Sequence, residues 1–401
     1  MTPTPTTTNT VIVSSARTPI GKLSGSLSSL SATDLGGLAI AAALERAGIP
    51  AAAVDRVIMG HVLQAGQGQN PARQAAAKGG VPMEVPAVTV NSVCLSGIHA
   101  IHLAHQLIQS GEADVVVAGG MESMSQAPYL LPGARAGYRL GDVTAVDSMI
   151  RDGLWCAFDD VHMGAGTEAY TRAAGITRGR QDELAAMSHQ RACIATKEGR
   201  LAGEIVPVTV RQRREELVVD TDEGIRSETT VDGLGRLKPA FSPDGTITAG
   251  NASQISDGAA AVVVMSRAKA DELGLSPLAE LVGFGLVAGP DPSLLTQPAR
   301  AITQALARFG GGRHVTDVDR FEINEAFAAV AAASIDDLGL SDDVVNVNGG
   351  AIALGHPIGM SGTRLVMTLV EELRRSGGGL GAAALCGGGG QGEAALVVVG
   401  T

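Results

Sequence analysis

The chain is organised around one stretch, VNSVCLSG at residues 90–97. A β-branched apolar run ends at residue 90, and apolar residues recur at helical spacing after residue 97, so a strand is expected to run into a helix with Cys94 at the junction. Because the first N–H groups of a helix are unpaired and its dipole favours negative charge, Cys94 is expected to lose its proton more easily than an ordinary thiol. The alternative is a small buried hydrophobe, the commonest fate of a free cysteine.

Strands and helices are expected to alternate around this stretch. Strands are predicted at residues 57–60 and 113–118, and an alanine-rich helix is predicted at residues 70–78. Before them, Asp34 is expected to cap a helix that ends at Gly48. The alternation predicts a mostly parallel sheet with helices on both faces.

The later part of the chain repeats this unit. In each copy one Ser-Gly pair opens a helix, a second pair closes it, and an apolar strand and a run of glycines follow. The matching features are Ser96-Gly97 with Ser361-Gly362, Ser110-Gly111 with Ser376-Gly377, and residues 119–120 with residues 387–390. Equal element lengths indicate a duplicated α/β unit. Two such halves packed back to back would bring their strand-to-helix junctions together, where ligand clefts of α/β sheets lie.

The length of 401 residues predicts two or three domains. We expect a flexible tail at 1–10, an N-terminal half at 11–275 and a C-terminal half at 276–401. The first half contains a Pro- and Gly-interrupted region, at about 122–250, which we interpret as an inserted loop domain forming a lid. Within it we expect charged helical segments at 182–200 and an exposed ribbon at 206–219, which carries Arg211, Arg213 and Arg214.

Composition limits the partners. The net charge of −11 argues against nucleic acid or an anionic membrane as the main partner, although an anionic small molecule needs only local positive charge. The four cysteines have no CxxC spacing, so neither a disulfide framework nor a metal centre is expected. The N-terminus has no apolar core typical of a signal peptide, and no apolar run approaches membrane-spanning length. A cytoplasmic location is expected.

Three further segments carry chemistry. His356 lies in the glycine-rich segment NVNGGAIALGHPIGMSG at 346–362, Cys386 begins CGGGGQG, and Asn324 begins NEAFA. A histidine with a pKa near neutrality could take the Cys94 proton, and consecutive glycines offer backbone N–H donors. Each also has a structural alternative: a turn histidine bonded to the backbone, a packed thiol, and a helix N-cap.

Together these four segments resemble the thiolase family, which makes or degrades 3-ketoacyl-CoA thioesters. The resemblance runs from residue 17 to residue 392 and includes GGMESMS at 119–125, HMG at 162–164 and GNAS at 250–253. Residues 147–154 and the pair His162-Met163 are most similar to the short-chain biosynthetic members. The resemblance implies two βαβαβαββ halves packed as a five-layer α-β-α-β-α sandwich, with an inserted loop domain.

The resemblance also implies roles. Cys94 would take an acetyl group as a thioester after activation by His356, and Cys386 would remove a proton from the methyl group of a second acetyl-CoA. One oxyanion hole would combine His356 with a water held by Asn324, and the other would use the backbone N–H groups of Cys94 and Gly388. The expected reaction is the reversible condensation of two acetyl-CoA to acetoacetyl-CoA and CoA, with ping-pong kinetics.

Coenzyme A thioesters are thus expected as substrate and product, with no permanently bound cofactor. The resemblance places the adenine–phosphate end of CoA near Arg226 and Leu237. The other expected substrate contacts are His162, Met163, Phe241, Ala249, Ser253, Leu294, Ala326 and Phe327. Two positions depart from the family pattern: LLTQP at 294–298 replaces a Met-Gly-Thr-Gly-Pro segment, and Gly233 replaces a polar residue. The first makes the chain-length preference less secure.

Three alternatives stay open. A degradative 3-ketoacyl-CoA thiolase of broader chain length shares the fold. A decarboxylating condensing enzyme needs no α-proton base, so Cys386 argues against it. A silent CoA- or lipid-binding protein would not need Cys94, His356 and Asn324 together. The resemblance further implies a homo-oligomer, either a dimer or a dimer of dimers joined through a loop of the insertion.

Overall fold

The computed structural model describes residues 9–211 and 215–400. Of the predicted tail, residues 1–8 lie outside the described residues, and Thr10 already belongs to the first strand. Arg213 and Arg214 of the predicted ribbon also lie outside them. The described part of that ribbon is an antiparallel pair, β10 (Val208–Arg211) and β11 (Glu216–Val219).

One continuous sheet runs through both halves of the molecule. Its order is β14-β15-β16-β13-β1-β12-β5-β3-β4, and β2 pairs with β12. The two halves join where Thr10 of β1 pairs with Leu281 of β13. The strands are β1 (Thr10–Arg17), β2 (Gly21–Lys22), β3 (Arg56–Gly60), β4 (Ala87–Val90), β5 (Val115–Ser123), β12 (Ser256–Ser266), β13 (Ala279–Ala288), β14 (Arg320–Ile323), β15 (Gly379–Gly387) and β16 (Gln391–Val399).

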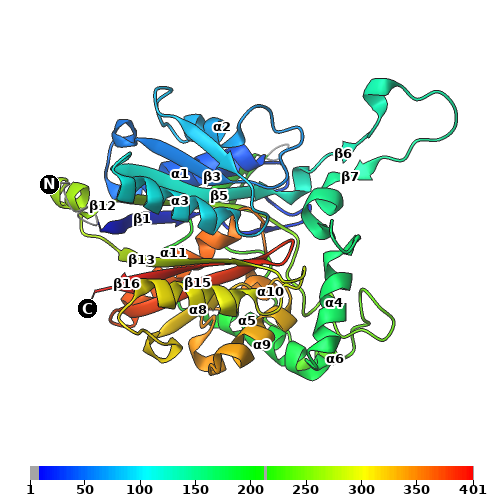
Figure 1. The fold of residues 1–401 in the computed structure, drawn as a ribbon. Helices are drawn as coiled ribbons and strands as arrows, with labels where there is room; N and C mark the ends of the chain where they lie inside the picture. The colour runs from blue at the N-terminus through cyan, green and yellow to red at the C-terminus, as the bar shows by residue number, and fades with distance from the viewer. Residues whose placement is uncertain (1–8, 212–214, 401) are drawn as a thin grey trace.

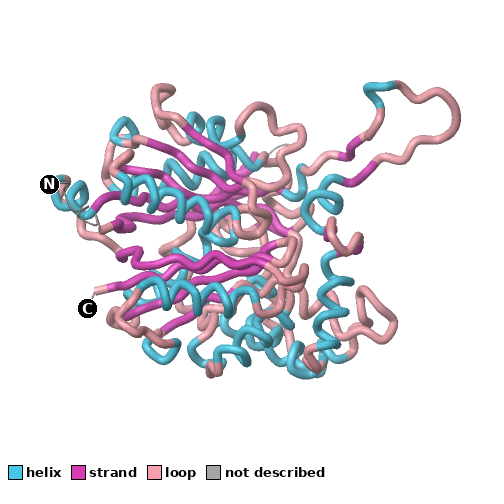
Figure 2. The backbone as a smooth tube through the Cα atoms, viewed as in Figure 1, coloured by secondary structure: helices cyan, strands magenta, loops and turns pink. Residues whose placement is uncertain are grey.

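The helices and the two parts of the sheet stack in alternating layers (Figure 1). Two helices cover the outer face of the N-terminal part, two lie between the parts, and the C-terminal part is covered by α8 with α9 and α5 beside it. Figure 2 shows the same layering by element type. The principal helices are α1 (Ala32–Ala47) and α2 (Pro71–Lys78) outside, α3 (Ser96–Ser110) and α11 (Ser361–Arg375) in the middle, and α5 (Arg178–Lys197), α8 (Gln297–Phe309) and α9 (Ala328–Leu338) below. The five-layer fold expected from the sequence is confirmed.

The expectation of a mostly parallel sheet is wrong. Parallel pairs join β3 to β4, β3 to β5 and β14 to β15, whereas the other pairs of this sheet, among the described strands, are antiparallel. The difference arises because the last strands of each half return without a crossover helix. β15 and β16 form a hairpin through the glycine run, and β12 comes back beside β5 after the insertion.

The ends of the predicted helices are largely as expected. Asn70 caps α2 ahead of Pro71, and Gly48 ends α1 in the left-handed region at φ 67°. The cap assigned to Asp34 is wrong, because Ser31 is the N-cap of α1. Asp34 is the third helical residue and bonds back to the Ser31 backbone, which completes a capping box.

The two central helices meet at their first turns. α3 and α11 are 15 residues each and begin with the Ser-Gly pairs of the duplicated unit. A Cβ on Gly362 would lie 2.4 Å from the backbone nitrogen of Ile98, and one on Gly97 would lie 2.8 Å from the backbone nitrogen of Thr363. Glycine therefore lets the backbones of the two halves touch beside the loops that precede these helices.

The predicted insertion is divided in the structure. An arm of β6 (Tyr129–Leu130) and β7 (Val146–Asp147) projects from the body (Figure 1), and α5 packs beneath the C-terminal half. Leu184 and Ala185 of α5 join the apolar cluster around Phe321, so this part belongs to the core instead of a lid. The remaining elements of the region are η2 (Met124–Gln126), η3 (Ala134–Ala136), η4 (Met149–Leu154), β8 (Trp155–Cys156), β9 (Val161–His162), α4 (Met163–Ala173) and α6 (Val231–Gly235).

The other short elements connect these layers. They are η1 (Ala51–Ala53), α7 (Arg267–Glu272), η5 (Val315–Asp317), η6 (Asp342–Val344) and α10 (Ala351–Leu354). The interior is almost wholly aliphatic, as expected from an aromatic content of 2%. In the described part of the chain, no helix has both the length and the apolar character needed to cross a membrane.

Candidate active site

Cys94 lies in a strained turn between β4 and α3. Val93, just before it, has φ 51°, a left-handed conformation that is unusual for a β-branched residue. The Ser96 hydroxyl holds this turn: its Oγ accepts a hydrogen bond from the Ser92 N–H (2.9 Å) and donates one to the Val93 carbonyl (2.6 Å). The strand-to-helix junction predicted for Cys94 is confirmed. The strain at Val93 and the role of Ser96 were not predicted, because neither residue type signals them in the sequence.

The expected low pKa of Cys94 is wrong. Burial raises the pKa of Cys94 to about 12, although hydrogen bonds from the backbone N–H groups of Cys94 and Gly388 oppose the shift. The negative charge of Glu122 adds to the increase. α3 begins only at Ser96, so the thiol lies beyond the helix end and its dipole does not offset burial. A Cys94 thiolate therefore requires a base.

His356 has the properties of that base. Its Nδ1 lies 2.6 Å from the Ser361 Oγ, and this hydroxyl donates to the Pro357 carbonyl at 2.9 Å. Because the hydroxyl proton is used there, Nδ1 carries the ring proton and donates it to Ser361, which leaves Nε2 as an acceptor. Nε2 is buried and has no hydrogen-bond partner among the described residues. Burial lowers the pKa of His356 to about 4, helped by Arg364, so the ring is neutral at pH 7.

Cys386 lies at the end of β15 with no exposed surface. Burial raises its pKa, and so does the charge of Cys94 when that thiol is ionised, which places the two sulfurs near one another. The turn after Cys386 depends on glycine: Gly390 has φ 67°, and a Cβ there would lie 2.0 Å from the Asp291 carbonyl oxygen. This tight turn brings the Gly388 N–H to Cys94.

Asn324 follows β14 and is fully buried. Its backbone N–H bonds to the Ala384 carbonyl, whereas neither Oδ1 nor Nδ2 of its side chain has a partner among the described residues. The N-cap alternative is wrong, because α9 begins at Ala328 with Phe327 at its cap position. A buried amide with free donor and acceptor atoms suits an ordered water.

A cavity of about 240 Å³ connects these elements. Among the predicted site residues, those that line it come from both halves and from the insertion. They are Cys94, His356, Gly388, Met163, Ser253, Leu294, Ala326 and Phe327. Residues 151–154 of the π-helical turn η4, residues 155–158 of the insertion and Ile358 also line the cavity. Asn324 and Cys386 are buried and do not line this cavity.

The other predicted substrate contacts lie outside the cavity lining. His162 stacks on Phe241 at a centroid distance of 4.9 Å, and Phe241 meets Phe327 edge-on at 6.4 Å, so an aromatic row leads away from the cavity. Ala249, Arg226 and Leu237 are exposed at the surface. The Arg226 backbone N–H donates a hydrogen bond to His189 Nδ1 (3.1 Å), and its guanidinium forms no ion pair with any residue that the structure describes.

Glu122 is a site residue that sequence reasoning missed. It is the penultimate residue of β5 and has no exposed surface, and its carboxylate accepts hydrogen bonds from the backbone N–H groups of Val62, Leu63 and Gly359. The His61 Nε2 lies 3.3 Å from the same carboxylate. Glu122 thus ties loops of the N-terminal half to the loop that carries His356. The available signal was an acidic residue at the end of the apolar and glycine-rich run at 115–121.

A buried thiol, a neutral imidazole and converging backbone N–H groups around one apolar cavity define an acyl-transfer site. The thiolase N-terminal domain family matches residues 10–268, and the thiolase C-terminal domain family matches residues 275–399. The chain therefore belongs to the thiolase family, and it is an acyltransferase.

Several relatives are similar over nearly their whole length. A probable acetyl-CoA acetyltransferase of Mycolicibacterium smegmatis is 58% identical over 388 residues, which cover 96% of this chain and 100% of the relative. The acetyl-CoA acetyltransferase of Cupriavidus necator is 52% identical over 392 residues, covering 97% and 99%. The crystal structure of the Bacillus anthracis acetyl-CoA acetyltransferase matches with a TM-score of 0.96 at 40% identity, covering 99% of this chain and 100% of that one.

Proposed function

We propose that the enzyme condenses two acetyl-CoA molecules to acetoacetyl-CoA and CoA, reversibly and by ping-pong kinetics through an acetyl group on Cys94. The observation that carries this proposal is the buried Nε2 of His356, an unpaired proton acceptor on the wall of the cavity that also holds Cys94. The names of the relatives above support acetyl-CoA as the substrate.

In the acylation step, His356 Nε2 takes the proton of Cys94, and the thiolate attacks the thioester carbonyl of acetyl-CoA. The carbon–sulfur bond to Cys94 forms, the bond to CoA breaks, and the CoA thiolate takes a proton from Cys386. The backbone N–H groups of Cys94 and Gly388 point at the sulfur of Cys94 and would stabilise the oxyanion of the tetrahedral intermediate. Each such donor typically contributes about 100- to 1000-fold in rate.

In the condensation step, the Cys386 thiolate removes a proton from the methyl group of the second acetyl-CoA. A thiolate in a site that raises its pKa is a strong base, which suits this weakly acidic proton. The enolate oxygen would be stabilised by protonated His356 and a water on the free amide of Asn324. The enolate carbon attacks the acetyl group, and Cys94 leaves as a thiolate that recovers its proton from His356.

A short acyl chain fits the walls of the cavity. Leu294 and Ile358 are almost fully buried and line it together with Phe327, so a long chain would have to displace packed side chains. The second candidate is a degradative 3-ketoacyl-CoA thiolase of broader chain length, which is kept because Leu294 departs from the Met that is typical of short-chain members. Rates with acetoacetyl-CoA and with longer 3-ketoacyl-CoA thioesters distinguish the two candidates: higher kcat/KM for long chains would overturn the biosynthetic assignment.

We also propose that CoA lies along the aromatic row with its phosphates near Arg226, and that no resident cofactor takes part. Homo-oligomerisation, as a dimer or a dimer of dimers, belongs to the same proposal. The arm beside β6 and β7 supports it, because Tyr129, Leu131 and Leu140 expose 69%, 54% and 100% of their surface there. Shortening the arm between Leu131 and Val146 is expected to lower the mass of the oligomer measured by sedimentation, because fewer subunits would associate. An oligomer with an unchanged number of subunits would exclude the arm as the contact between subunits.

The experiment that tests the chemistry is intact-mass analysis after incubation with acetyl-CoA. The wild type is expected to gain one acetyl group, Cys94→Ser none, and Cys386→Ser one acetyl group without forming acetoacetyl-CoA. Cys193→Ser is the matched control, because Cys193 is a free cysteine on α5 outside the cavity lining. An acetyl group retained by Cys94→Ser would refute the assignment of the nucleophile.

A further inference from the structure

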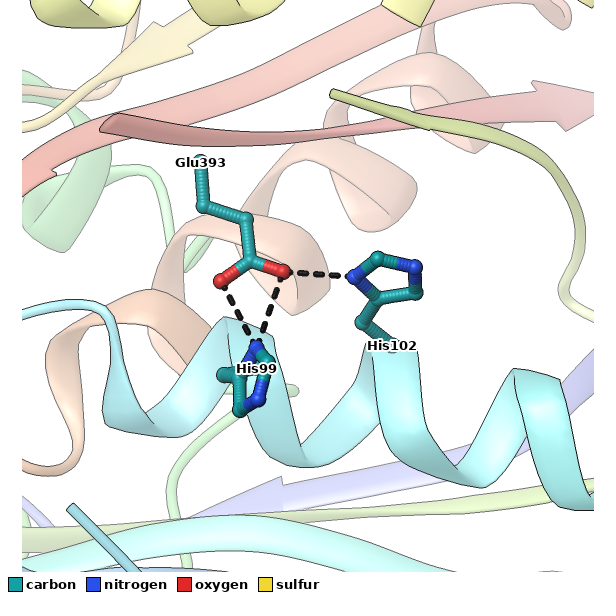
Figure 3. Close-up of side chains that lie close together, drawn as sticks. All are labelled: His99, His102 and Glu393. Carbon is teal, nitrogen blue, oxygen red and sulfur yellow. Dashed lines mark hydrogen bonds and ion pairs between the residues drawn. The ribbon is translucent and has the colours of Figure 1, made fainter. Parts of the chain in front are cut away.

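Two imidazoles and one carboxylate converge between α3 and β16 (Figure 3). His99 and His102 lie on the same face of α3, and Glu393 reaches them from β16. The His102 Nδ1 is 2.7 Å from Glu393 Oε1, and the His99 Nδ1 is 3.2 Å from both carboxylate oxygens. The proposed acyl-transfer chemistry uses none of these residues.

Glu393 is an unusual residue for its position. It has no exposed surface and lies in a strand that is otherwise apolar from Ala394 to Val399, opposite Leu385 of β15. Among the residues that the structure describes, its only ion-pair partners are the two histidines. Burying a carboxylate is costly unless cationic charge compensates it. The hydrogen-bond partners of the Glu393 carboxylate are the two Nδ1 atoms, so the carboxylate faces both imidazoles.

The three groups have the geometry of a coordination site. One ligand atom from each lies within 4.8 Å of the other two. Ligands at zinc bond lengths in a tetrahedral shell stand about 3.3 Å apart. The two imidazole Nδ1 atoms lie 2.7 and 3.2 Å from the carboxylate oxygens. The side chains of His99 and His102 are 27% and 12% exposed, and an open cavity of about 490 Å³ borders His102, so a hydrated ion can reach the site.

The surroundings of His102 hold its ring in place. The ring stacks on Phe284 with a centroid distance of 4.3 Å, and its Nε2 lies 3.2 Å from the Gln106 side-chain nitrogen. Rotation of the Gln106 amide would present its oxygen to an Nε2–H when Nδ1 binds a metal. A hydrogen bond of this kind to the second ring nitrogen is a regular feature of histidine ligands.

We propose that His99, His102 and Glu393 bind one divalent transition-metal ion of the zinc type. Two imidazole nitrogens and a carboxylate oxygen suit Zn²⁺, Co²⁺ or Ni²⁺ better than Mg²⁺ or Ca²⁺, and water completes the shell. The sequence did not indicate this site, because Glu393 is almost 300 residues away from the histidines.

The ion would link the two halves of the enzyme directly behind the reacting groups. α3 begins two residues after Cys94, and Glu393 follows Gly392, whose register partner on β15 is Cys386. The ion would therefore fix the helix that follows one thiol to the strand beside the other. Its effect is on stability, because the proposed reaction involves no metal.

The test is calorimetric titration of chelator-stripped enzyme with Zn²⁺. The wild type is expected to bind one ion per chain, and His99→Ala and Glu393→Gln are expected to bind it at least about tenfold more weakly. Zn²⁺ should also raise the unfolding temperature of the wild type and leave that of Glu393→Gln unchanged. Glu393→Gln keeps the side-chain shape, and its acetylation by acetyl-CoA shows that the variant is folded.

Two controls separate this site from other ligands. His314→Asn removes an exposed histidine at the cap of η5 and is expected to bind Zn²⁺ like the wild type. Cys94→Ser tests for a thiolate ligand and is also expected to bind normally. The proposal is overturned if the wild type shows no saturable binding, if Glu393→Gln binds as tightly as the wild type, or if Cys94→Ser abolishes binding.

Discussion

Ser361→Ala should disable the base while leaving the cavity intact. The Ser361 hydroxyl is buried and fixes His356 through two hydrogen bonds in sequence, from Nδ1–H to Oγ at 2.6 Å and from Oγ–H to the Pro357 carbonyl at 2.9 Å. Without it, the Nδ1–H loses its acceptor, and the ring proton can move to Nε2, which then cannot accept the proton of Cys94.

The size of the effect follows from the buried hydrogen bond. Leaving a buried donor without a partner costs about 1–3 kcal/mol, and each 1.4 kcal/mol corresponds to about tenfold in rate, so kcat is expected to fall about 5- to 150-fold. The KM for acetoacetyl-CoA should change less than about twofold, because Ser361 does not line the cavity. Steady-state thiolysis of acetoacetyl-CoA measures both constants.

Ser14→Ala is the matched control. Ser14 is also buried and also donates its hydroxyl to one carbonyl, that of Ala43 at 2.6 Å, but it lies in β1 away from the cavity. This variant should lose stability and keep kcat. If Ser361→Ala keeps a kcat within about twofold of the wild type, or loses no more activity than Ser14→Ala, the assigned histidine tautomer is wrong.

Three further predictions follow from other residues. Leu294→Ala should raise kcat/KM for longer 3-ketoacyl-CoA thioesters about tenfold relative to acetoacetyl-CoA, because Leu294 closes the cavity; an unchanged ratio would move the chain-length determinant elsewhere. Gly120→Ala should abolish folding or activity, because the added Cβ would lie 1.9 Å from the Gly359 carbonyl oxygen. Gly203→Ala is the control: no described atom lies within 4 Å of its added Cβ, so its expression and its rate should match those of the wild type. Burial, together with Arg226, lowers the pKa of His189 to about 4, so its contribution to stability is present above pH 6.5 and is lost as the pH falls towards 4. Urea denaturation measures the free energy of unfolding at pH 7 and at pH 5. Between these two pH values, His189→Gln should lose about 2 kcal/mol less of this free energy than the wild type loses. An equal loss in the two proteins would contradict the lowered pKa of His189.

Local patterns in the sequence predicted individual elements well. The strand-to-helix junction at Cys94 and the helix that begins after Asn70 are found where expected, because helical periodicity, capping residues and terminal glycines act within a few residues. The duplication was equally visible, since α3 and α11 have the same length and the same Ser-Gly start. These features depend only on near neighbours along the chain.

Features that depend on distant contacts were not predicted. The antiparallel pairing of β5 with β12 requires the chain to return after the whole insertion, and no local signal sets that direction. The pKa of Cys94 depends on how deeply both halves bury it, which a helix-end argument does not include. Glu122 likewise can link the two halves only after the loop that contains Gly359 has packed against it.

The contact between the two halves also has a consequence for the newly made chain. Cys94 comes from the first half, whereas His356 and Cys386 come from the second, and Glu122 accepts the hydrogen bond of the Gly359 N–H only after both halves have docked. While the first half stands alone on the ribosome, its thiol has neither its base nor its oxyanion donor from Gly388. In the proposed mechanism, acyl transfer therefore begins only when translation and docking are complete, and an unfinished chain would not consume thioesters.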